Sequence, residues 1–402
     1  MEQVNKKLMN WASILEDNTR EQAVTASTMP FIFPHIALMP DAHLGMGATV
    51  GSVIPTLGAI MPAAVGVDIG CGMIAVKTEY HERELGKDTG YNPGDRSTLQ
   101  PLSTLRESIE HAIPLSAGKY NHEVNRSHTR ARVESLQAKA DQYGFDPAEY
   151  AGNWALQLGT LGSGNHFIEV SLDEAGRVWL FLHSGSRGVG NKIATKYIKI
   201  AQDQCAKRFI ELPHKDLAYL VEGDKEFWDY IKRMTWAQQF AFENRAEMMD
   251  RVIECFGQWI GGGVDRVEEI NCHHNYTVRE KHWGKEVWLS RKGAINAEKG
   301  TWGLIPGSMG TASYVVEGKG NALSLNSSPH GAGRNYSRSA ARQTFTQEDL
   351  EKAMTGIEWS GSSEFIDEIP QAYKPIDVVM EDAVDLVEVR HTLRQILNVK
   401  GD

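Results

Sequence analysis

The chain has 402 residues, 41% of them hydrophobic and 23% charged, and its formal net charge at pH 7 is −10. This balance is that of a globular protein long enough to bury a substantial core without disulfide staples. The charge gives no support for a broad basic surface that binds nucleic acids non-specifically, although a local groove or bound metal ions could still supply positive charge.

In chain order, the residue patterns predict an apolar core tract, a strand, a loop, two helices, a second strand, two more helices and a third strand. The corresponding residues are 58–70, 73–78, 83–100, 103–113, 129–143, 178–183, 191–209, 225–256 and 287–291. The strands are short and rich in β-branched or aromatic residues, whereas apolar residues recur at helical spacing in the helices. We interpret the aromatic residues of 225–256 as core. Thr346 followed by Asp349 predicts one further helix start.

Strands and helices do not alternate regularly in this pattern, which indicates the α+β class rather than a doubly wound sheet. No repeat or linker divides the sequence, so we expect residues 1–402 to form one domain. The four cysteines form no CxxC pair, and free thiols fit a reducing compartment. Without an apolar N-terminal segment or a run of about 18 apolar residues, we expect neither a signal peptide nor a membrane span. We therefore expect a cytoplasmic protein.

Seven segments place a polar or metal-binding side chain among small residues, mostly glycines. They are MPDAHLGMG (39–47), GVDIGCGM (66–73), GTLGSGNHFIE (159–169), LHSGSRGVG (182–190), NCHHN (271–275), PGSMGT (306–311) and PHGAGR (329–334). Glycine allows the backbone to turn sharply and to approach a ligand closely. One such segment is weak support for a site, but seven in one chain are hard to explain by folding alone.

Asp68 and Cys71 lie three residues apart in a D-x-x-C-G turn. A carboxylate and a thiolate at this spacing could both reach one metal centre, and a thiolate can bridge two cations. The alternative is a buried cysteine beside an aspartate that caps a turn.

The histidines add possible ligands of another kind. His166 follows a glycine loop and His183 ends the apolar run VWLFLH, although a lone histidine in such a place is more often a satisfied core residue. His273 and His274 are adjacent, so their side chains should diverge and at most one should bind a given site. Imidazole and thiolate together suit Zn, Mn, Fe or Co, and two cations about 4 Å apart suit phosphate chemistry.

His330 lies among small residues, four positions before Arg334. An unhindered imidazole beside a guanidinium suits attack on a phosphate, whereas the alternative is a loop histidine with no role. The PGSMGT turn, with the Ser308 hydroxyl, could bind an anion through its backbone N–H groups or could simply be a structural turn. No Walker A motif occurs, so a nucleotide would have to bind by another route.

With these motifs in place, the sequence resembles the RtcB-type RNA-splicing ligases over nearly the whole chain, from residue 29 to residue 401. The resemblance is carried by PAAVGVDIGCGM, GTLGSGNHFIE, HSGSRG, INCHHN, RKGA, PGSMG, HGAGR, DEIPQAYKPID and VEVRHTLRQILNVKG. It implies a single compact α+β domain. It also implies an enzyme of RNA repair or tRNA splicing that uses GTP and Mn²⁺ to join a 2′,3′-cyclic phosphate or 3′-phosphate end to a 5′-hydroxyl end.

The same resemblance implies roles for individual residues. Two manganese ions would be held by Asp68, Cys71, His166, His183 and His274, with Cys71 bridging them. His330 would attack the α-phosphate of GTP and carry GMP as a phosphoramidate. The nucleotide phosphates and sugar would contact Asn165, Ser308 and Ser313, and the guanine would contact Glu169, Tyr373 and Lys400. RNA phosphates would meet Arg187 and Arg334.

One feature departs from the family pattern, in which a Cys-Ser pair commonly precedes the nucleophilic histidine. This chain instead has Asn326, Ser327, Ser328 and Pro329, and the proline fixes its own φ and lacks an N–H, which could alter how His330 is presented. Residues 83–150 also diverge, a pattern compatible with a specialised RNA-repair paralogue. The expected partners are RNA and GTP, and an accessory activating protein is a third candidate partner. We expect the protein to be a monomer.

Two other functions stay open at this point. The first is a metal-dependent phosphoesterase or cyclic phosphodiesterase that has lost ligation, and the second is a non-catalytic RNA- or metal-binding protein. His330 and Lys400 favour the ligase, because a hydrolase needs neither a histidine that carries GMP nor a guanine pocket. The presence of every expected type of metal ligand argues against the non-catalytic protein.

Overall fold

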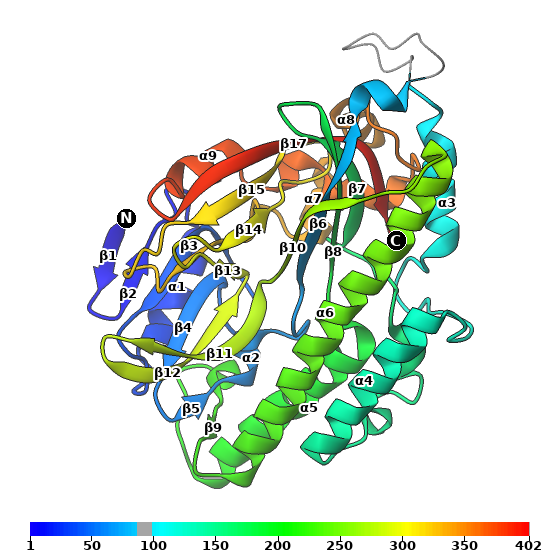
Figure 1. The fold of residues 1–402 in the computed structure, drawn as a ribbon. Coiled ribbons are helices and arrows are strands. Elements are labelled where there is room, and N and C mark those ends of the chain that lie inside the picture. The colour runs from blue at the N-terminus through cyan, green and yellow to red at the C-terminus, as the bar shows by residue number, and fades with distance from the viewer. Residues whose placement is uncertain (87–98, 402) are drawn as a thin grey trace.

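Two large β-sheets form the centre of the computed structural model, which describes residues 1–86 and 99–401, and helices cover the far side of one sheet (Figure 1). Most of the loop predicted at 83–100 therefore lies outside the described residues. No helix in the described part of the chain is long and apolar enough to cross a lipid bilayer.

The first sheet has six strands in the order β1-β2-β3-β4-β12-β11. Their bounds are β1 Glu2–Asn5, β2 Leu8–Asn10, β3 Ile36–His43, β4 Val50–Thr56, β11 Asn275–His282 and β12 Lys285–Lys292. Strands β2 and β3 are parallel, and the other neighbours are antiparallel. Because β3 and β4 are buried along almost their whole length, this part of the sheet is covered on both faces.

The second sheet has seven strands, all antiparallel to their neighbours, in the order β10-β6-β8-β7-β17-β15-β14. Their bounds are β6 Gly72–His81, β7 Phe167–Leu172, β8 Arg177–Ser184, β10 Arg266–His273, β14 Trp302–Ile305, β15 Ser313–Gly318 and β17 Val387–Lys400. Two short ribbons complete the strands: β5 (Ala59–Ile60) with β9 (Leu220–Val221), and β13 (Ala294–Asn296) with β16 (Ser327–Pro329).

The second sheet is buried on both faces, and successive residues of β6 show this. Met73 and Ala75 belong to the core cluster that also holds Val53 and Leu289 of the first sheet. Their neighbours Ile74 and Val76 belong to a different cluster, which contains apolar residues of two helices. Successive side chains of a strand point to opposite faces, so one face of this sheet packs on the other sheet and the opposite face packs on helices.

Four helices lie on this side of the second sheet: α3 (Leu102–Ala112), α4 (Ser127–Tyr143), α5 (Arg187–Lys207) and α6 (Lys225–Ile260). Helix α6 runs across β6, β8 and β10, α3 packs on the sheet beside it, and α4 and α5 pack against α6 (Figure 1). The short helices are α1 (Asp17–Ser27), α2 (Pro62–Val65), α7 (Arg338–Thr344), α8 (Gln347–Ala353) and α9 (Ile376–Asp382). This arrangement confirms the predicted α+β class.

The predicted elements are confirmed, with shifts at their ends. All three strands and all four helices form, and the apolar tract after residue 58 is buried as β5 and α2. Helix α5 begins at Arg187 rather than at the predicted residue 191. Gly188 and Gly190 are part of the helix, and Gly190 packs closely against Ser186 and Ala237. Helix α6 extends to Ile260, where Gly261 adopts a left-handed conformation (φ 78°) that ends it.

The cap at the start of α8 also forms as predicted. Thr346 accepts a hydrogen bond from the backbone N–H of Asp349, and the Asp349 carboxylate accepts one from the backbone N–H of Thr346. The aromatic residues Phe227 and Phe240 of α6 are fully buried, as expected of core residues.

Candidate functional site

A cavity of about 360 Å³ opens where the loops between the two sheets meet. Each of the seven segments singled out from the sequence contributes at least one residue to its wall. Segments that are hundreds of residues apart in the chain therefore line one pocket, and this common position explains why small residues surround a polar side chain in each of them.

Five predicted ligand side chains converge at one end of this pocket. Asp68 and Cys71 lie in the turn between α2 and β6, His166 just before β7, and His183 near the end of β8. His274 is the single residue between β10 of the second sheet and β11 of the first, so it lies where the chain passes from one sheet to the other.

The donor atoms form two groups that share the thiol. One group is Cys71, His183 and His274, and the other is Asp68, Cys71 and His166. The Cys71 Sγ lies 3.2 Å from His183 Nε2 and 3.4 Å from His166 Nε2. His166 Nε2 is 3.1 Å from a carboxylate oxygen of Asp68. The shared Sγ is therefore placed to contact ions in both groups.

Each histidine of the cluster is oriented through its other ring nitrogen. The Nδ1 atoms of His166, His183 and His274 lie 2.8 Å from the Leu161 carbonyl, 3.1 Å from the Asn165 carbonyl and 3.2 Å from the Asn275 amide oxygen, respectively. Oxygens of this kind can only accept, so each Nδ1 carries a proton, and the neutral rings of His183 and His274 each present a lone pair at Nε2.

The Nε2 atoms of His183 and His274 meet at the centre of the cluster. His183 Nε2 and His274 Nε2 are only 2.8 Å apart, so two lone pairs face each other. Burial lowers the pKa of both imidazoles well below the usual 6.5 and raises the pKa of the Cys71 thiol well above 9.0. A cation between these atoms would remove the repulsion and favour the thiolate, so the donor set fits a metal centre.

Asp68 supplies the fixed negative charge of the cluster. Burial opposes its ionisation, but the hydrogen bond and charge of His166, with the charge of Arg187, lower the pKa of Asp68 to about 2. The carboxylate is therefore ionised at neutral pH.

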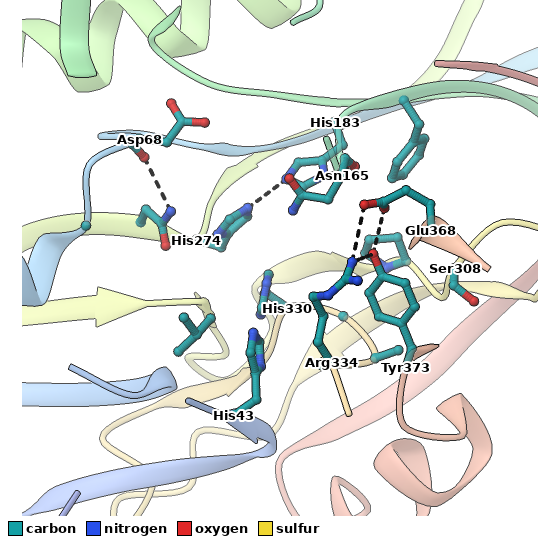
Figure 2. A pocket seen from close by; sticks show the side chains of 18 of the residues that line it. His43, Asp68, Asn165, His183, His274, Ser308, His330, Arg334, Glu368 and Tyr373 are labelled. Atoms are coloured by element: carbon teal, nitrogen blue, oxygen red, sulfur yellow. Dashed lines mark hydrogen bonds and ion pairs between the residues drawn. The ribbon is translucent and has the colours of Figure 1, made fainter. Parts of the chain in front are cut away.

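His330 lies beside this cluster, directly after β16 (Figure 2). Its ring centroid is 4.4 Å from that of His274, and its Nδ1 is 2.7 Å from Asp41 Oδ2, at an angle short of good hydrogen-bond geometry. The same oxygen accepts the backbone N–H groups of His330 and Gly331 at 3.1 and 3.2 Å. Pro329 has no N–H group, but the N–H groups of the next two residues both donate to Asp41.

Asp41 is a site residue that the sequence reasoning missed. It is fully buried in β3, within the MPDAH segment that was itself singled out. The signal was an aspartate next to glycine-rich sequence, but nothing in the sequence alone pairs that aspartate with a histidine 289 positions away.

The other end of the pocket is built from paired charges. The carboxylate of Glu368, another residue the sequence reasoning missed, accepts a hydrogen bond from the Tyr373 hydroxyl at 2.6 Å and lies 3.2 Å from Arg334 Nη1 and 3.5 Å from Lys400 Nζ (Figure 2). Arg338 is a further ion-pair partner. Burial opposes ionisation of Glu368, but the charges of these cations lower its pKa to about 2.

Of the predicted nucleotide contacts, Glu169 and Ser308 line the same pocket as this charged group, and Ser313 lies at the start of β15. Glu169 accepts a hydrogen bond from Asn398 at 3.2 Å through one oxygen, while its second oxygen and the Ser313 hydroxyl are buried without a partner. Burial raises the pKa of Glu169 to about 8. Ser308 lies in the turn after β14, where its backbone N–H donates to the Thr311 hydroxyl at 2.6 Å.

Of two further predicted site residues, Asn165 lies on the pocket wall and Arg187 does not. Asn165 lines the pocket and orients His183 through its carbonyl. Arg187 instead packs against Gly162 and donates from Nε to the Thr160 hydroxyl at 3.1 Å. His273 diverges from His274, as expected for adjacent residues, and its Nδ1 lies 3.1 Å from a nitrogen of Arg245.

Comparison with known proteins agrees with this geometry. Residues 22–401 match the family model described as tRNA-splicing ligase RtcB. The chain belongs to this RtcB family. It is 46% identical to the RNA-splicing ligase RtcB of Escherichia coli strain K12 over 96% of this chain and 95% of that protein. It is 31% identical to the tRNA-splicing ligase RtcB of Pyrobaculum aerophilum, over 94% of this chain and 90% of that protein. The family resemblance stated from the motifs is confirmed, and membership makes the chain an enzyme of the ligase class.

Proposed function

We propose that the chain is a GTP- and Mn²⁺-dependent ligase that joins RNA ends through a guanylated histidine. Its substrates would be a 2′,3′-cyclic phosphate or 3′-phosphate end and a 5′-hydroxyl end, in RNA repair or tRNA splicing. The observation that carries the proposal is the position of His330, whose ring centroid lies 4.4 Å from that of His274, at the edge of a five-residue cluster of metal-ligand types.

Asp68, Cys71, His166, His183 and His274 would hold the two manganese ions, with Cys71 shared between them. Bound there, the ions would neutralise the charge that grows on phosphate oxygens during the reaction. The donor set supports divalent transition-metal ions, and within it the Asp68 carboxylate suits Mn²⁺; the choice of manganese follows the family resemblance.

His330 would attack the α-phosphate of GTP. Because Nδ1 lies against Asp41, it keeps its proton and Nε2 keeps the lone pair that attacks. A P–N bond forms to Nε2, the bond from the α-phosphate to the bridging oxygen breaks, and pyrophosphate leaves. The Asp41 carboxylate, 2.7 Å from Nδ1, would stabilise the positive charge that develops on the ring.

The RNA 3′-phosphate would then take GMP from His330, so that a phosphate–phosphate link forms as the P–N bond breaks. A cyclic phosphate end would first be opened by hydrolysis in the same site. The 5′-hydroxyl oxygen would attack the activated 3′-phosphate and lose its proton to water, so that a phosphodiester bond forms as the phosphate–phosphate link breaks and GMP leaves. Arg187 and Arg334 would contact RNA phosphates, which requires Arg334 to share its guanidinium with Glu368.

The charged end of the pocket would bind the guanine through Glu169, Tyr373 and Lys400. A guanine offers N–H donors to a carboxylate and a carbonyl acceptor to an ammonium group, and Glu169 has an unpartnered buried oxygen. Asn165, Ser308 and Ser313 would contact the phosphates and the sugar, and the Ser313 hydroxyl is likewise buried without a partner. A nucleotide in this place would satisfy both groups.

We further propose that residues 1–402 form one ligase domain and that the protein is a monomer in the cytoplasm. An accessory activating protein is a candidate partner. The test is a joining reaction between a labelled RNA that ends in a 2′,3′-cyclic phosphate and an RNA with a 5′-hydroxyl end, with GTP and Mn²⁺. The wild type should give the joined product and His330→Ala should not. Opening of the cyclic phosphate without joining would contradict the proposal and indicate the hydrolase.

A further inference from the structure

Two neighbouring residues in the middle of α6, Asn244 and Arg245, have no exposed surface and lie directly behind the metal-ligand cluster. Neither was singled out in the sequence, and neither belongs to the pocket wall. Helix α6 approaches the ligand-bearing loops closely. A Cβ at Gly70, whose φ is +72°, would come within 2.8 Å of Ala241 and 2.9 Å of the Gln238 Cα. The helix is thus fitted against the turn that carries Cys71.

The guanidinium of Arg245 reaches the chain neighbours of one group of ligands. It donates to the Gly70 carbonyl at 2.8 Å and the Ser184 carbonyl at 3.2 Å, and lies 3.1 Å from His273 Nδ1. These three residues directly adjoin, in sequence, the members of the group Cys71, His183 and His274. A single side chain therefore fixes all three segments that carry this group.

The side-chain amide of Asn244 reaches the other group. Its oxygen accepts the backbone N–H groups of Gly159 and Thr160 at 2.7 and 3.2 Å, and its nitrogen donates to the carbonyls of Thr160 at 3.2 Å and Gly185 at 3.1 Å. The next carbonyl along, that of Leu161, is the one that orients His166.

Gly185 connects the same amide to the carboxylate of this group. A Cβ at Gly185 would lie 2.2 Å from an oxygen of Asp68, and the following N–H, that of Ser186, donates to Asp68 at 3.1 Å. Asn244 thus holds both the loop that orients His166 and the turn that holds Asp68.

We propose that Asn244 and Arg245 are positioning residues that divide the metal centre between them. Arg245 sets the group of Cys71, His183 and His274, and Asn244 sets Asp68 and His166 of the second group. This inference rests on the proposed two-metal site. Partners of this kind, which contact the residues beside metal ligands, typically contribute about 10- to 100-fold to metal affinity.

The chemistry of the two side chains suits this division. Within the described part of the chain Arg245 forms no ion pair with a carboxylate, and its hydrogen bonds go to the carbonyls of Gly70 and Ser184 and to the Asn271 amide oxygen at 2.8 Å. A buried cation without a counter-ion is costly, so it is retained only where several acceptors must be held at once. The planar fork of arginine can do this, whereas the ammonium group of lysine cannot span the same acceptors.

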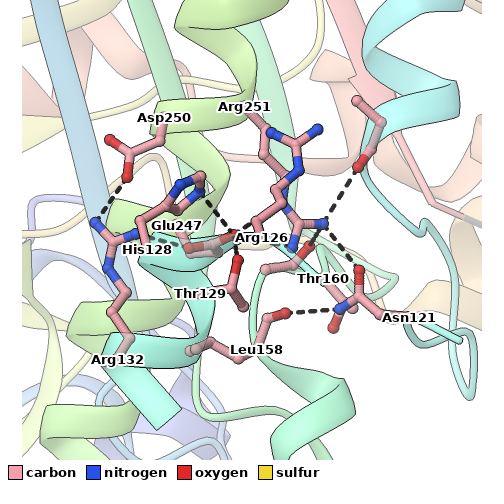
Figure 3. A network of polar contacts seen from close by, with 12 residues as sticks. Asn121, Arg126, His128, Thr129, Arg132, Leu158, Thr160, Glu247, Asp250 and Arg251 are labelled. Carbon is pink, nitrogen blue, oxygen red and sulfur yellow. Dashed lines mark hydrogen bonds and ion pairs between the residues drawn. The ribbon is translucent and has the colours of Figure 1, made fainter. Parts of the chain in front are cut away.

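Another polar network on the same helix serves as the control. Glu247, three residues after Asn244 on α6, is ion-paired with Arg132 of α4 at 2.6 Å and with Arg251 at 3.0 Å (Figure 3). Arg132 also pairs with Asp250 and Glu243. The contacts of Arg132 itself join α4 to α6, and within this network only Arg251 reaches the loop of His166, donating to the Gly159 carbonyl at 3.2 Å. Arg132→Met should therefore lower the free energy of unfolding without changing metal affinity.

The test is calorimetric titration of metal-free protein with Mn²⁺ alone, for the wild type, Asn244→Ala, Arg245→Met and Arg132→Met. The wild type should bind two ions. Each α6 variant should bind the ion of its own group about 10- to 100-fold more weakly and the other ion with a smaller loss, because Cys71 belongs to both groups. Arg132→Met should match the wild type. Circular dichroism verifies folding, and Asn244→Asp and Arg245→Lys replace any variant that does not fold, with a smaller loss expected.

Pairing with ligand variants shows which ion is affected. Arg245→Met should add nothing to the loss caused by His183→Ala but should add to the loss caused by His166→Ala, and Asn244→Ala should do the reverse. A wild type that binds two ions, with α6 variants that bind both as well as Arg132→Met, would overturn this inference alone. A wild type that binds fewer than two ions would overturn the proposed two-metal site as well.

Discussion

The two ends of the pocket reach electrostatic balance in opposite ways. At the charged end, Glu368 is surrounded by Lys400, Arg334 and Arg338, so its charge is compensated by the protein itself. At the ligand end, lone pairs of His183 and His274 face each other at 2.8 Å, and no protein cation lies between them. The first end is balanced by the charges of the protein, whereas under the proposed function an added cation would balance the second. The predictions below test this difference.

The largest effect is expected at the thiol shared by the two ligand groups. Cys71→Ser should remove both ions together and abolish joining, because a hydroxyl buried there is a far weaker metal ligand than a thiolate. Metal counting by mass spectrometry on the purified protein measures this directly. Loss of one ion with retention of the other would refute the bridge, and Cys205→Ser, at a buried thiol away from the pocket, should leave both ions bound.

The second effect concerns the partner of His330. Asp41→Asn should slow transfer of GMP to the protein by about 100-fold or more, because the amide oxygen would still accept the two backbone N–H groups but would no longer bring a negative charge to face the ring as it becomes positive. The rate of protein labelling by GTP gives the measurement. Asp216→Asn, which changes a carboxylate elsewhere on the pocket wall, is the matched control. Equal labelling rates for the Asp41 variant and the wild type would contradict a role for this carboxylate.

The third effect separates the two ends. Glu368→Gln should raise the KM for GTP by about 10- to 100-fold, since it weakens charge-assisted hydrogen bonds to groups that would hold the nucleotide. The same variant should still bind two manganese ions with wild-type affinity. A fall in metal content on this substitution would show that the two ends are not independent, and an unchanged KM would place the nucleotide elsewhere.

The smallest effect is a pH dependence of stability that comes from Glu169. Its folded pKa of about 8 lies above the ordinary value of 4.5. Between these two values the unfolded chain releases a proton that the folded protein keeps, so stability falls as the pH rises from about 4.5 to 8. Glu169→Gln removes this contribution. The Tm of the wild type should therefore decline relative to that of the variant across this range, and parallel curves would show that Glu169 is ionised in the folded protein.

Much of the fold could be predicted because local patterns report burial. The strand at β6 and the helix at α6 carry apolar residues at the spacing of their own geometry. Strand β17 was missed, although it is central in the second sheet, because VEVRHTLRQILNVK carries charged residues at its exposed start. Those charges hide the apolar alternation of the buried half.

The site likewise contains residues that could be predicted from local sequence and residues that could not. Residues such as Cys71 and His183 could be singled out because small residues surround them in the sequence. Asp41, Glu368 and Arg245 could not, because each acts through a partner far away in the chain: His330, Lys400 and the Gly70 carbonyl. Only the packing of the two sheets and α6 brings such pairs together.

The central claim is that His330 accepts GMP beside a pair of metal ions, and covalent labelling tests it most directly. The wild type, incubated with GTP labelled at the α-phosphate and Mn²⁺, should retain label that is lost on mild acid treatment, as expected of a phosphorus–nitrogen bond. His330→Ala and a chelator should each prevent labelling. Label that persists in His330→Ala, or a metal-loaded wild type that takes up none, would contradict the account.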